Sequence, residues 1–364
     1  MNNTKQAYEK AMQVIEACST PHGLYASAGN NGYTMVWSRD SMISLIGASL
    51  SGNFKEVFKK SIITLAENQS ENGQIPNAVD KWSQRNPHVD FKTIDSTLWF
   101  ILGNFVYHQR YNDSSLLSKY KLNLEKAFNW LACQDPGQTH MLAQLPTSDW
   151  QDAFPHKYGH TINTQALYYK SLLISGKKSQ ANALKKRVNT NEDDCLWNGS
   201  FYLAYRWKNH GKYKEIGDWF DTLGNLLAII FELSNNAQAE KIITYIKKNK
   251  IAEPYPAKSI FPPISPQSKY WQDYYLDCDA QTPYHYSNAG IWPFIGGFYV
   301  LALIKLKKFD EAEKELEKLA EANLDTFPEW INPLTKEKHG YFQAWSAGCY
   351  ILAYESLKKR KVLI

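Results

Sequence analysis

The sequence predicts an all-α fold, an (α/α)6 barrel in which six inner helices are enclosed by six outer ones. Three observations predict it: helical periodicity along the whole chain, alternation of apolar with amphipathic segments, and alternation of short with long links. A helix that is apolar on every side has to be surrounded by other helices. Successive antiparallel helices place all the long links at one end of a bundle. A double ring of helices satisfies both conditions.

Six apolar segments are interpreted as the inner helices. Among them are STLWFILGNFVY, TLGNLLAIIFEL and SAGCYILAYESL, which leave almost no polar face. Their unequal spacing argues against a solenoid of strict period. The six begin near Ser41, Ser96, Asn163, Thr222, Gly290 and Ala344.

The segments between them are amphipathic and rich in Lys and Glu, which is typical of outer helices with one face in water. KQAYEKAMQVIEAC opens the chain, and KEVFKKSIITLAEN, KYKLNLEKAFNWL, AEKIITYIKKN and DEAEKELEKLAEAN follow. We therefore expect one barrel domain over residues 1–364, with about a dozen helices and little strand.

Aromatic residues are frequent: 12 Trp, 23 Tyr and 16 Phe make up 14% of the chain. Many lie beside acids and amides in the long links, where a core does not require them. If these links converge over the centre of the ring, they form a concave, aromatic-lined pocket. Sugars suit such a pocket, because their C–H faces stack on rings while polar side chains bind their hydroxyls. We therefore expect a small carbohydrate substrate.

Other features exclude several classes of protein. No run of about 18 apolar residues predicts a membrane span, and the polar first residues lack the apolar core of a signal peptide, so we expect a cytoplasmic protein. The five scattered cysteines lack CxxC spacing, which predicts free buried thiols and no zinc site. The net charge of +5 accompanies no nucleic-acid motif, so no nucleic-acid partner is expected. Oligomeric state is left open.

Cleavage of a glycosidic bond requires two carboxyl groups, one to donate a proton and one to activate water or attack. Two segments stand out among the long links. In SDWQDAFPHKYGH, rings flank Asp149 and Asp152, and in FPEWINP a tryptophan and two prolines enclose Glu329. A single loop acid beside a tryptophan is more often structural. The joint placement of these acids on one face of the barrel favours a catalytic role. The candidate acids are Asp40, Asp80, Asp90, Asp95, Asp149, Asp152, Asp218, Asp221, Asp273, Asp277, Asp279 and Glu329.

Two further segments directly precede apolar helices, and each has two interpretations. In WSRDS, Asp40 or Ser41 would cap the helix while Arg39 pairs with a carboxylate; alternatively, Arg39 and Asp40 grip sugar hydroxyls. TIDSTLW poses the same choice for Asp95, and there the cap is favoured.

These stretches resemble the inverting glycosidases built on an (α/α)6 barrel. They look most like the alkaline/neutral invertases of glycoside hydrolase family 100, and are similar to the glucosidase domain of glycogen-debranching enzymes. The resemblance runs through VWSRDSM, IDSTLWFI, SDWQDAFPHKYGHTINTQALYY, WFDTLGNLLAII, NAGIWPFIGGFYVLALIK and FPEWINP with YFQAWSAGCYILA. It implies Asp152 as general acid and Glu329 as general base. We expect substrate binding by Tyr33, Trp37, Arg39, Asp40, Asp95, Asp149, Trp150, His160, Gln165, Trp292, Gln343 and Trp345.

Two stretches depart from the invertases: KYGHTINTQ replaces a pattern resembling HGHPLEIQ, and GQIPNAV looks more like debranching-type sequences. The expected function is an inverting glycoside hydrolase of a small α-linked glucoside, sucrose first, without cofactor or metal. An exo-acting α-1,6-glucosidase is the main alternative. A sugar isomerase or epimerase using paired histidines and a non-catalytic carbohydrate-binding toroid stay open. The histidines on the long links are His88, His156, His160, His285 and His339.

Overall fold

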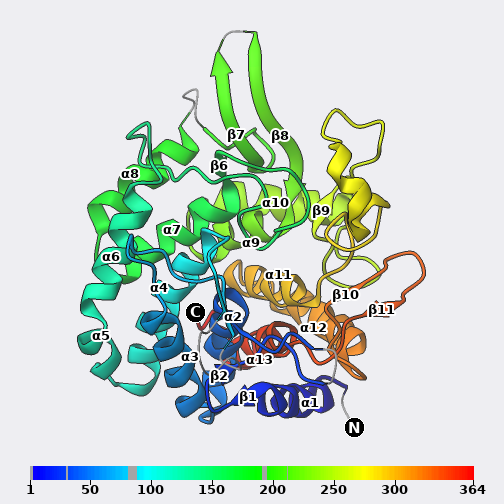
Figure 1. Ribbon diagram of the computed structural model, residues 1–364. Helices are drawn as coiled ribbons and strands as arrows, with labels where there is room; N and C mark the ends of the chain where they lie inside the picture. The colour runs from blue at the N-terminus through cyan, green and yellow to red at the C-terminus, as the bar shows by residue number, and fades with distance from the viewer. Residues whose placement is uncertain (1–2, 30–31, 81–87, 191–194, 211) are drawn as a thin grey trace.

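The computed structural model describes residues 3–29, 32–80, 88–190, 195–210 and 212–364. Parts of three of the expected long links, residues 30–31, 81–87 and 211, lie outside the described residues. In Figure 1 the helices form two concentric layers around a common centre. None of the helices in the described ranges is both long and apolar enough to cross a membrane.

The inner layer is a closed ring. Each of its helices contacts the next inner helix in the sequence, and the last inner helix, α13, contacts the first, α2. Every residue of the apolar α9 is buried, and so is every residue of α2, including the charged Arg39 and Asp40 in its first turn. The ring consists of α2 (Ser38–Ala48), α4 (Asp95–Tyr111), α7 (Ile162–Ile174), α9 (Thr222–Ile230), α11 (Pro293–Lys305) and α13 (Ala344–Lys358).

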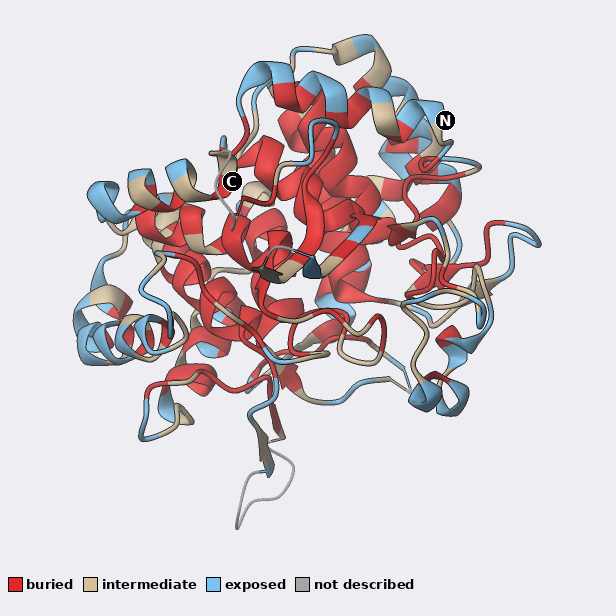
Figure 2. Cartoon of the chain, turned by 90° about the horizontal axis from the view of Figure 1, so that it is seen from above, coloured by how far each residue is buried: buried red, intermediate tan, exposed pale blue. Residues whose placement is uncertain are grey.

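The outer layer is amphipathic, and Figure 2 shows helices with exposed outer faces around an almost wholly buried centre. Its helices are α1 (Asn3–Cys18), α3 (Lys55–Glu67), α6 (Lys121–Ala132), α8 (Lys178–Asn189), α10 (Asn236–Lys248) and α12 (Phe309–Asn323), with short α5 (Ser115–Lys119) before α6. The predicted (α/α)6 barrel is confirmed.

The ring closes through a very close approach of α2 to α13. A Cβ atom added at Gly348 would lie 2.3 Å from the Cα of Ser44, and one at Gly47 would lie 1.9 Å from the Gly348 carbonyl oxygen. Only glycine leaves room for the two backbones at this crossing.

The expectation of little strand is wrong for one link. The link before the apolar helix that begins at Thr222 contains β8 (Tyr213–Asp221), which pairs antiparallel with β7 (Leu203–His210). Figure 1 shows this hairpin projecting beyond the helices. Its base joins β6 (His160–Thr161) and β9 (Ile260–Phe261) in a four-stranded sheet. The inward side chains of Tyr205 and Trp219 enter a second apolar cluster, and this burial stabilises the strands.

The remaining strands are short and lie within the other links. They are β1 (Ser19–Thr20), β2 (Gly23–Leu24), β3 (Val36–Trp37), β4 (Ala78–Asp80), β5 (His88–Asp90), β10 (Trp330–Ile331) and β11 (Lys338–His339). Three 3-10 helices span Ser49–Ser51, Asp273–Asp277 and Asp279–Gln281. All five cysteines are free, as predicted, although Cys133 is exposed and Cys278 only half-buried.

Candidate active site

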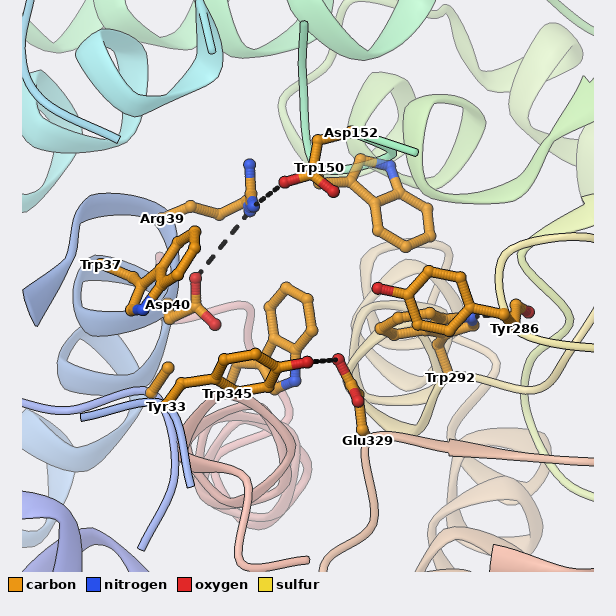
Figure 3. A pocket seen from close by; sticks show the side chains of 11 residues that line it. Tyr33, Trp37, Arg39, Asp40, Trp150, Asp152, Tyr286, Trp292, Glu329 and Trp345 are labelled. Carbon is orange, nitrogen blue, oxygen red and sulfur yellow. Dashed lines mark hydrogen bonds and ion pairs between the residues drawn. The ribbon is translucent and has the colours of Figure 1, made fainter. Parts of the chain in front are cut away.

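A pocket of about 130 Å³ lies where several inner helices begin. At 10–15 Å³ for each water centre it has room for about ten waters. Its wall is formed by the first turns of α2 and α13, the residue before α11 and the long links (Figure 3). The lining residues are Ala26, Tyr33, Trp37, Arg39, Asp40, Trp150, Asp152, Tyr286, Trp292, Glu329 and Trp345.

One buried guanidinium organises the acids on one side. Arg39 lies 3.2 Å from Asp95, 3.6 Å from Asp152 and 4.0 Å from Asp40. Burial lowers the pKa of Arg39, but the carboxylates outweigh this effect and keep the side chain charged. Burial raises the pKa of Asp40 to about 6, against the opposing charge of Arg39.

The cap predictions for this region are wrong. Helix α2 begins at Ser38 with Trp37 at the N-cap, so Asp40 and Ser41 are inside its first turn. Helix α4 begins at Asp95 itself, with Ile94 at the N-cap. The side chain of Asp95 pairs with Arg39, so the pairing of Arg39 with a carboxylate, expected in the same structural interpretation, is confirmed.

Asp152 comes from the link between α6 and α7, and 24% of its side chain is exposed. Burial raises its pKa, the charges of Arg39 and Lys92 oppose this rise, and Asp149 adds to it. The neighbouring Trp150 is held in place by aromatic contacts, with its ring centroid 5.4 Å from that of Trp292.

Glu329 directly precedes β10, and the β10–β11 pairing fixes its backbone. Its N–H donates to the His339 carbonyl oxygen at 2.9 Å. A Cβ atom at Gly340 would lie 2.7 Å from the Glu329 Cβ, and Gly340 has φ +63°, so glycine is required here. The tight turn leaves the carboxyl free to point into the pocket (Figure 3).

The surroundings of Glu329 favour its protonated form. Burial, followed by the negative charges of Asp40 and Asp152, raises its pKa to about 8. The Tyr33 hydroxyl donates to Glu329 Oε1 at 3.5 Å and opposes that rise. Figure 3 shows Glu329 and Asp152 reaching into the pocket from opposite sides. One proton donor and one proton acceptor can therefore flank a bound molecule.

The structure brings nine of the fourteen expected site residues to this pocket. They are Tyr33, Trp37, Arg39, Asp40, Trp150, Asp152, Trp292, Glu329 and Trp345. The other five, Asp95, Asp149, His160, Gln165 and Gln343, are buried and do not line it.

Direct sugar binding by Asp95, Asp149, His160 and Gln165 does not fit their positions, because their side-chain polar atoms contact other groups of the protein. Asp149 pairs with Lys157, while Gln165 donates to the Leu142 carbonyl oxygen. The His160 ring lies 3.2 Å from that same carbonyl. Asp95 pairs with Arg39, as described above. Gln343 is the residue before α13, and its backbone N–H donates to Phe327.

Two features were missed. Tyr286 lines the pocket from the long excursion between β9 and α11, and its carbonyl accepts from the Trp292 indole at 3.1 Å. The only sequence signal was its aromatic character within PYHYSNAG. The second feature is Lys157, a wholly buried lysine in the same link as Asp152.

Comparison with known proteins places these features in context. A family model described as amylo-alpha-1,6-glucosidase matches residues 9–352. Alkaline/neutral invertase C, mitochondrial, of Arabidopsis thaliana is 23% identical over 325 residues, 73% of this chain and 48% of the relative. Neutral/alkaline invertase 1, mitochondrial, of Oryza sativa subsp. japonica is 32% identical over 140 residues, 36% of this chain and 22% of that protein. The chain spans about half the length of the first of these relatives.

Solved structures show the same architecture at low identity. The GH63 mannosylglycerate hydrolase from Thermus thermophilus has a TM-score of 0.70 at 12% identity, covering 95% of this chain and 99% of that one. A bacterial glucoamylase complexed with acarbose has a TM-score of 0.63 at 15% identity, covering 98% of this chain and 56% of that one. These likenesses support the barrel fold.

Proposed function

Because the chain belongs to the amylo-alpha-1,6-glucosidase family, we propose that it is an inverting glycoside hydrolase acting on a small α-linked glucoside. The observation that carries the proposal is the placement of Asp152 and Glu329 on opposite sides of one aromatic-lined pocket (Figure 3). Two carboxyl groups that flank a sugar are the minimum machinery for glycosidic cleavage.

Asp152 is the general acid and Glu329 the general base in this proposal. Asp152 protonates the leaving oxygen, while Glu329 takes a proton from the attacking water. An inverting pair stands about 6.5–9.5 Å apart so that this water fits. The Tyr33 hydroxyl, next to Glu329, is placed to hold the water as well.

The charges around the pocket favour the opposite arrangement, with Asp152 ionised and Glu329 protonated. Burial raises the pKa of Asp152, but the charges of Arg39 and Lys92 oppose this rise, whereas the pKa of Glu329 is raised to about 8. The two groups are coupled, because the charge on Asp152 is one cause of the raised pKa of Glu329. A proton on Asp152 removes that cause and shifts Glu329 towards its ionised form, although burial and the charge of Asp40 continue to raise its pKa. We therefore propose that the pair shares one proton, and that the productive form holds it on Asp152.

A leaving-group experiment decides between the two assignments. A glycosyl fluoride needs little protonation of its leaving group, so the acid variant retains turnover on α-glucosyl fluoride while the base variant loses it. We expect Asp152→Asn to hydrolyse the fluoride and Glu329→Gln to fail. The reverse pattern would exchange the two roles and leave the hydrolase assignment intact.

The pocket favours a short substrate, since it has room for only about ten waters. Sucrose is the first candidate, supported by the two invertase relatives. An exo-acting α-1,6-glucosidase is the second, supported by the description of the family model. No histidine lines the pocket among the described residues, which disfavours an isomerase that uses paired histidines.

A substrate panel tests the proposal. Sucrose, isomaltose, trehalose, limit dextrin and mannosylglycerate are incubated with the wild type, with Asp152→Asn and with Glu329→Gln, and released sugar is measured. We expect wild-type turnover of at least one α-glucoside, its loss in both variants on that O-linked substrate, and unchanged helical circular dichroism. Binding without turnover of any glycoside would favour a carbohydrate-binding toroid instead.

A further inference from the structure

Lys157 is a wholly buried lysine five residues after Asp152, and its ammonium has three acceptors. Its Nζ atom lies 2.6 Å from Gln151 Oε1, 2.7 Å from Asp221 Oδ2 and 3.0 Å from Asp149 Oδ2. An ammonium carries three donors, so every one of them is used. Burial lowers the pKa of Lys157, but the charges of Asp149 and Asp221 outweigh this effect and keep the side chain charged.

Two of these acceptors belong to the short stretch that ends in Asp152. Asp149 Oδ1 also accepts the Gln151 backbone N–H at 2.9 Å, and Asp149 Oδ2 accepts the Gln144 side chain at 3.2 Å. Lys157 thereby closes a ring of contacts over residues 149–151. Asp152 is the next residue in the sequence after this ring of contacts.

The third acceptor anchors the stretch to the barrel. Asp221 is the N-cap of α9, where its Oδ1 accepts the Gly224 N–H at 3.0 Å. The same carboxylate therefore fixes the start of an inner helix and holds the ammonium of Lys157. The Asp152 stretch is tied through one cation to a rigid part of the fold.

We propose that Lys157 is a positioning residue that holds the Asp152 carboxyl at the scissile oxygen by tethering residues 149–152 to the N-terminus of α9. The inference rests on the proposed role of Asp152 as the general acid. Lys157 itself does not line the pocket and does not touch the substrate. Its loss should therefore impair proton donation more than sugar binding.

Three variants separate positioning from charge balance and from general stability. Lys157→Met removes the tether and leaves Asp149 and Asp221 without their cation. Lys157→Met/Asp221→Asn removes the tether but restores the net charge of the cluster, and asparagine also serves well as an N-cap. Lys258→Met is the matched control, because Lys258 is another buried lysine, outside the pocket, whose Nζ donates to the carbonyl oxygens of Lys250 and Glu253.

The readout is kcat on the O-linked substrate found by the panel, divided by kcat on α-glucosyl fluoride, measured well below the melting temperature of each variant. Both Lys157 variants should lose about 10- to 100-fold on the O-linked sugar and less than about threefold on the fluoride, with KM little changed. Lys258→Met should leave the ratio unchanged.

Two results would overturn the inference. In the first, Lys157→Met has the same kcat ratio as the wild type. In the second, the double variant recovers the wild-type ratio, which would mean that Lys157 serves only to balance the charge of the cluster. Asp152→Asn in the same assay keeps the two proposals apart. If Asp152→Asn leaves the kcat ratio unchanged, the assigned role of Asp152 as general acid is wrong. If Asp152→Asn changes the ratio but the Lys157 variants leave it unchanged, the positioning role of Lys157 is wrong.

Discussion

The Arg39 guanidinium lies 3.6 Å from the Asp152 carboxylate. This ion pair connects the first turn of α2 with the link that precedes α7, two segments more than a hundred positions apart in the sequence. Because Arg39 also holds Asp95 at the start of α4, one cation fixes three segments around the pocket. The stability of the barrel and the geometry of the candidate acid therefore depend on the same side chain.

Replacement of Arg39 by methionine should be strongly destabilising. It leaves the buried carboxyl groups of Asp95 and Asp40 without their cation, a loss that costs about 3–5 kcal/mol of unfolding free energy. Urea denaturation measures this cost. Arg110→Met is the control, because within the described residues the Arg110 side chain donates to one carbonyl oxygen, that of Leu363, and its loss should cost about 1 kcal/mol. Equal losses of unfolding free energy in the two variants would contradict the role of Arg39 as the cation that balances several buried carboxyl groups.

Replacement of Tyr33 by phenylalanine should shift the pH profile of turnover. The Tyr33 hydroxyl donates to ionised Glu329 and lowers the pKa of that carboxyl, so its removal raises this pKa. A base has to be ionised to act, and the acidic limb of the kcat profile should therefore move to higher pH, by about 0.5 unit for one long hydrogen bond. Exposed Tyr341→Phe is the control. A limb that stays in place, or moves to lower pH, would refute the contact.

Glu329→Gln should stabilise the protein at alkaline pH. The pKa of Glu329 is near 4.5 in the unfolded chain and about 8 in the fold, so the folded state binds the proton more tightly. The resulting stability is complete below pH 4.5 and is lost as the pH rises through 8. Glutamine stays neutral and avoids that loss, which we place at about 1–3 kcal/mol because solvent reaches the pocket.

Thermal unfolding of the wild type and Glu329→Gln across this pH range provides the measurement. The two should melt together near pH 4.5 and separate steadily up to about pH 8, with the variant more stable. Exposed Glu337→Gln should show no such divergence. A constant difference in melting temperature between the wild type and Glu329→Gln at all pH values would mean that folding does not raise the pKa of Glu329.

Gly348→Ala should weaken the closure of the ring. The added methyl group would lie 2.3 Å from the Cα of Ser44, so α2 and α13 have to move apart. Overpacking of this kind costs about 1–3 kcal/mol. Chemical denaturation compares it with Gly137→Ala, where the nearest atom is the end of the Thr139 side chain at 3.1 Å. A variant as stable as that control would refute the close helix crossing.

The barrel could be predicted from the sequence because its signal is repeated twelve times. Apolar and amphipathic helices alternate, and two inner helices begin at the predicted residues, Thr222 and Ala344. The pocket could be anticipated as well, since antiparallel helices place their long links at one end. The β7–β8 hairpin could not, because the charged run from Lys212 to Glu215 suggests a solvated loop until its strand partner is known.

The interior of the site depends on contacts that no local pattern encodes. Asp149 beside Trp150 has the appearance of a pocket acid, yet it lies behind the pocket wall because Lys157 is buried next to it. The position of Asp95 before an apolar helix predicts a cap, but its side chain pairs with Arg39 from another segment. Each of these outcomes depends on pairing between distant links.

Proton NMR of the first turnovers on an α-linked substrate tests most directly whether Asp152 and Glu329 act across a water. Attack by a water that Glu329 activates, on the face opposite the leaving group that Asp152 protonates, releases the β-anomer of the sugar first, with the α-anomer appearing later by mutarotation. Initial release of the α-anomer would show retention, and would contradict the placement of a water between these two carboxyl groups.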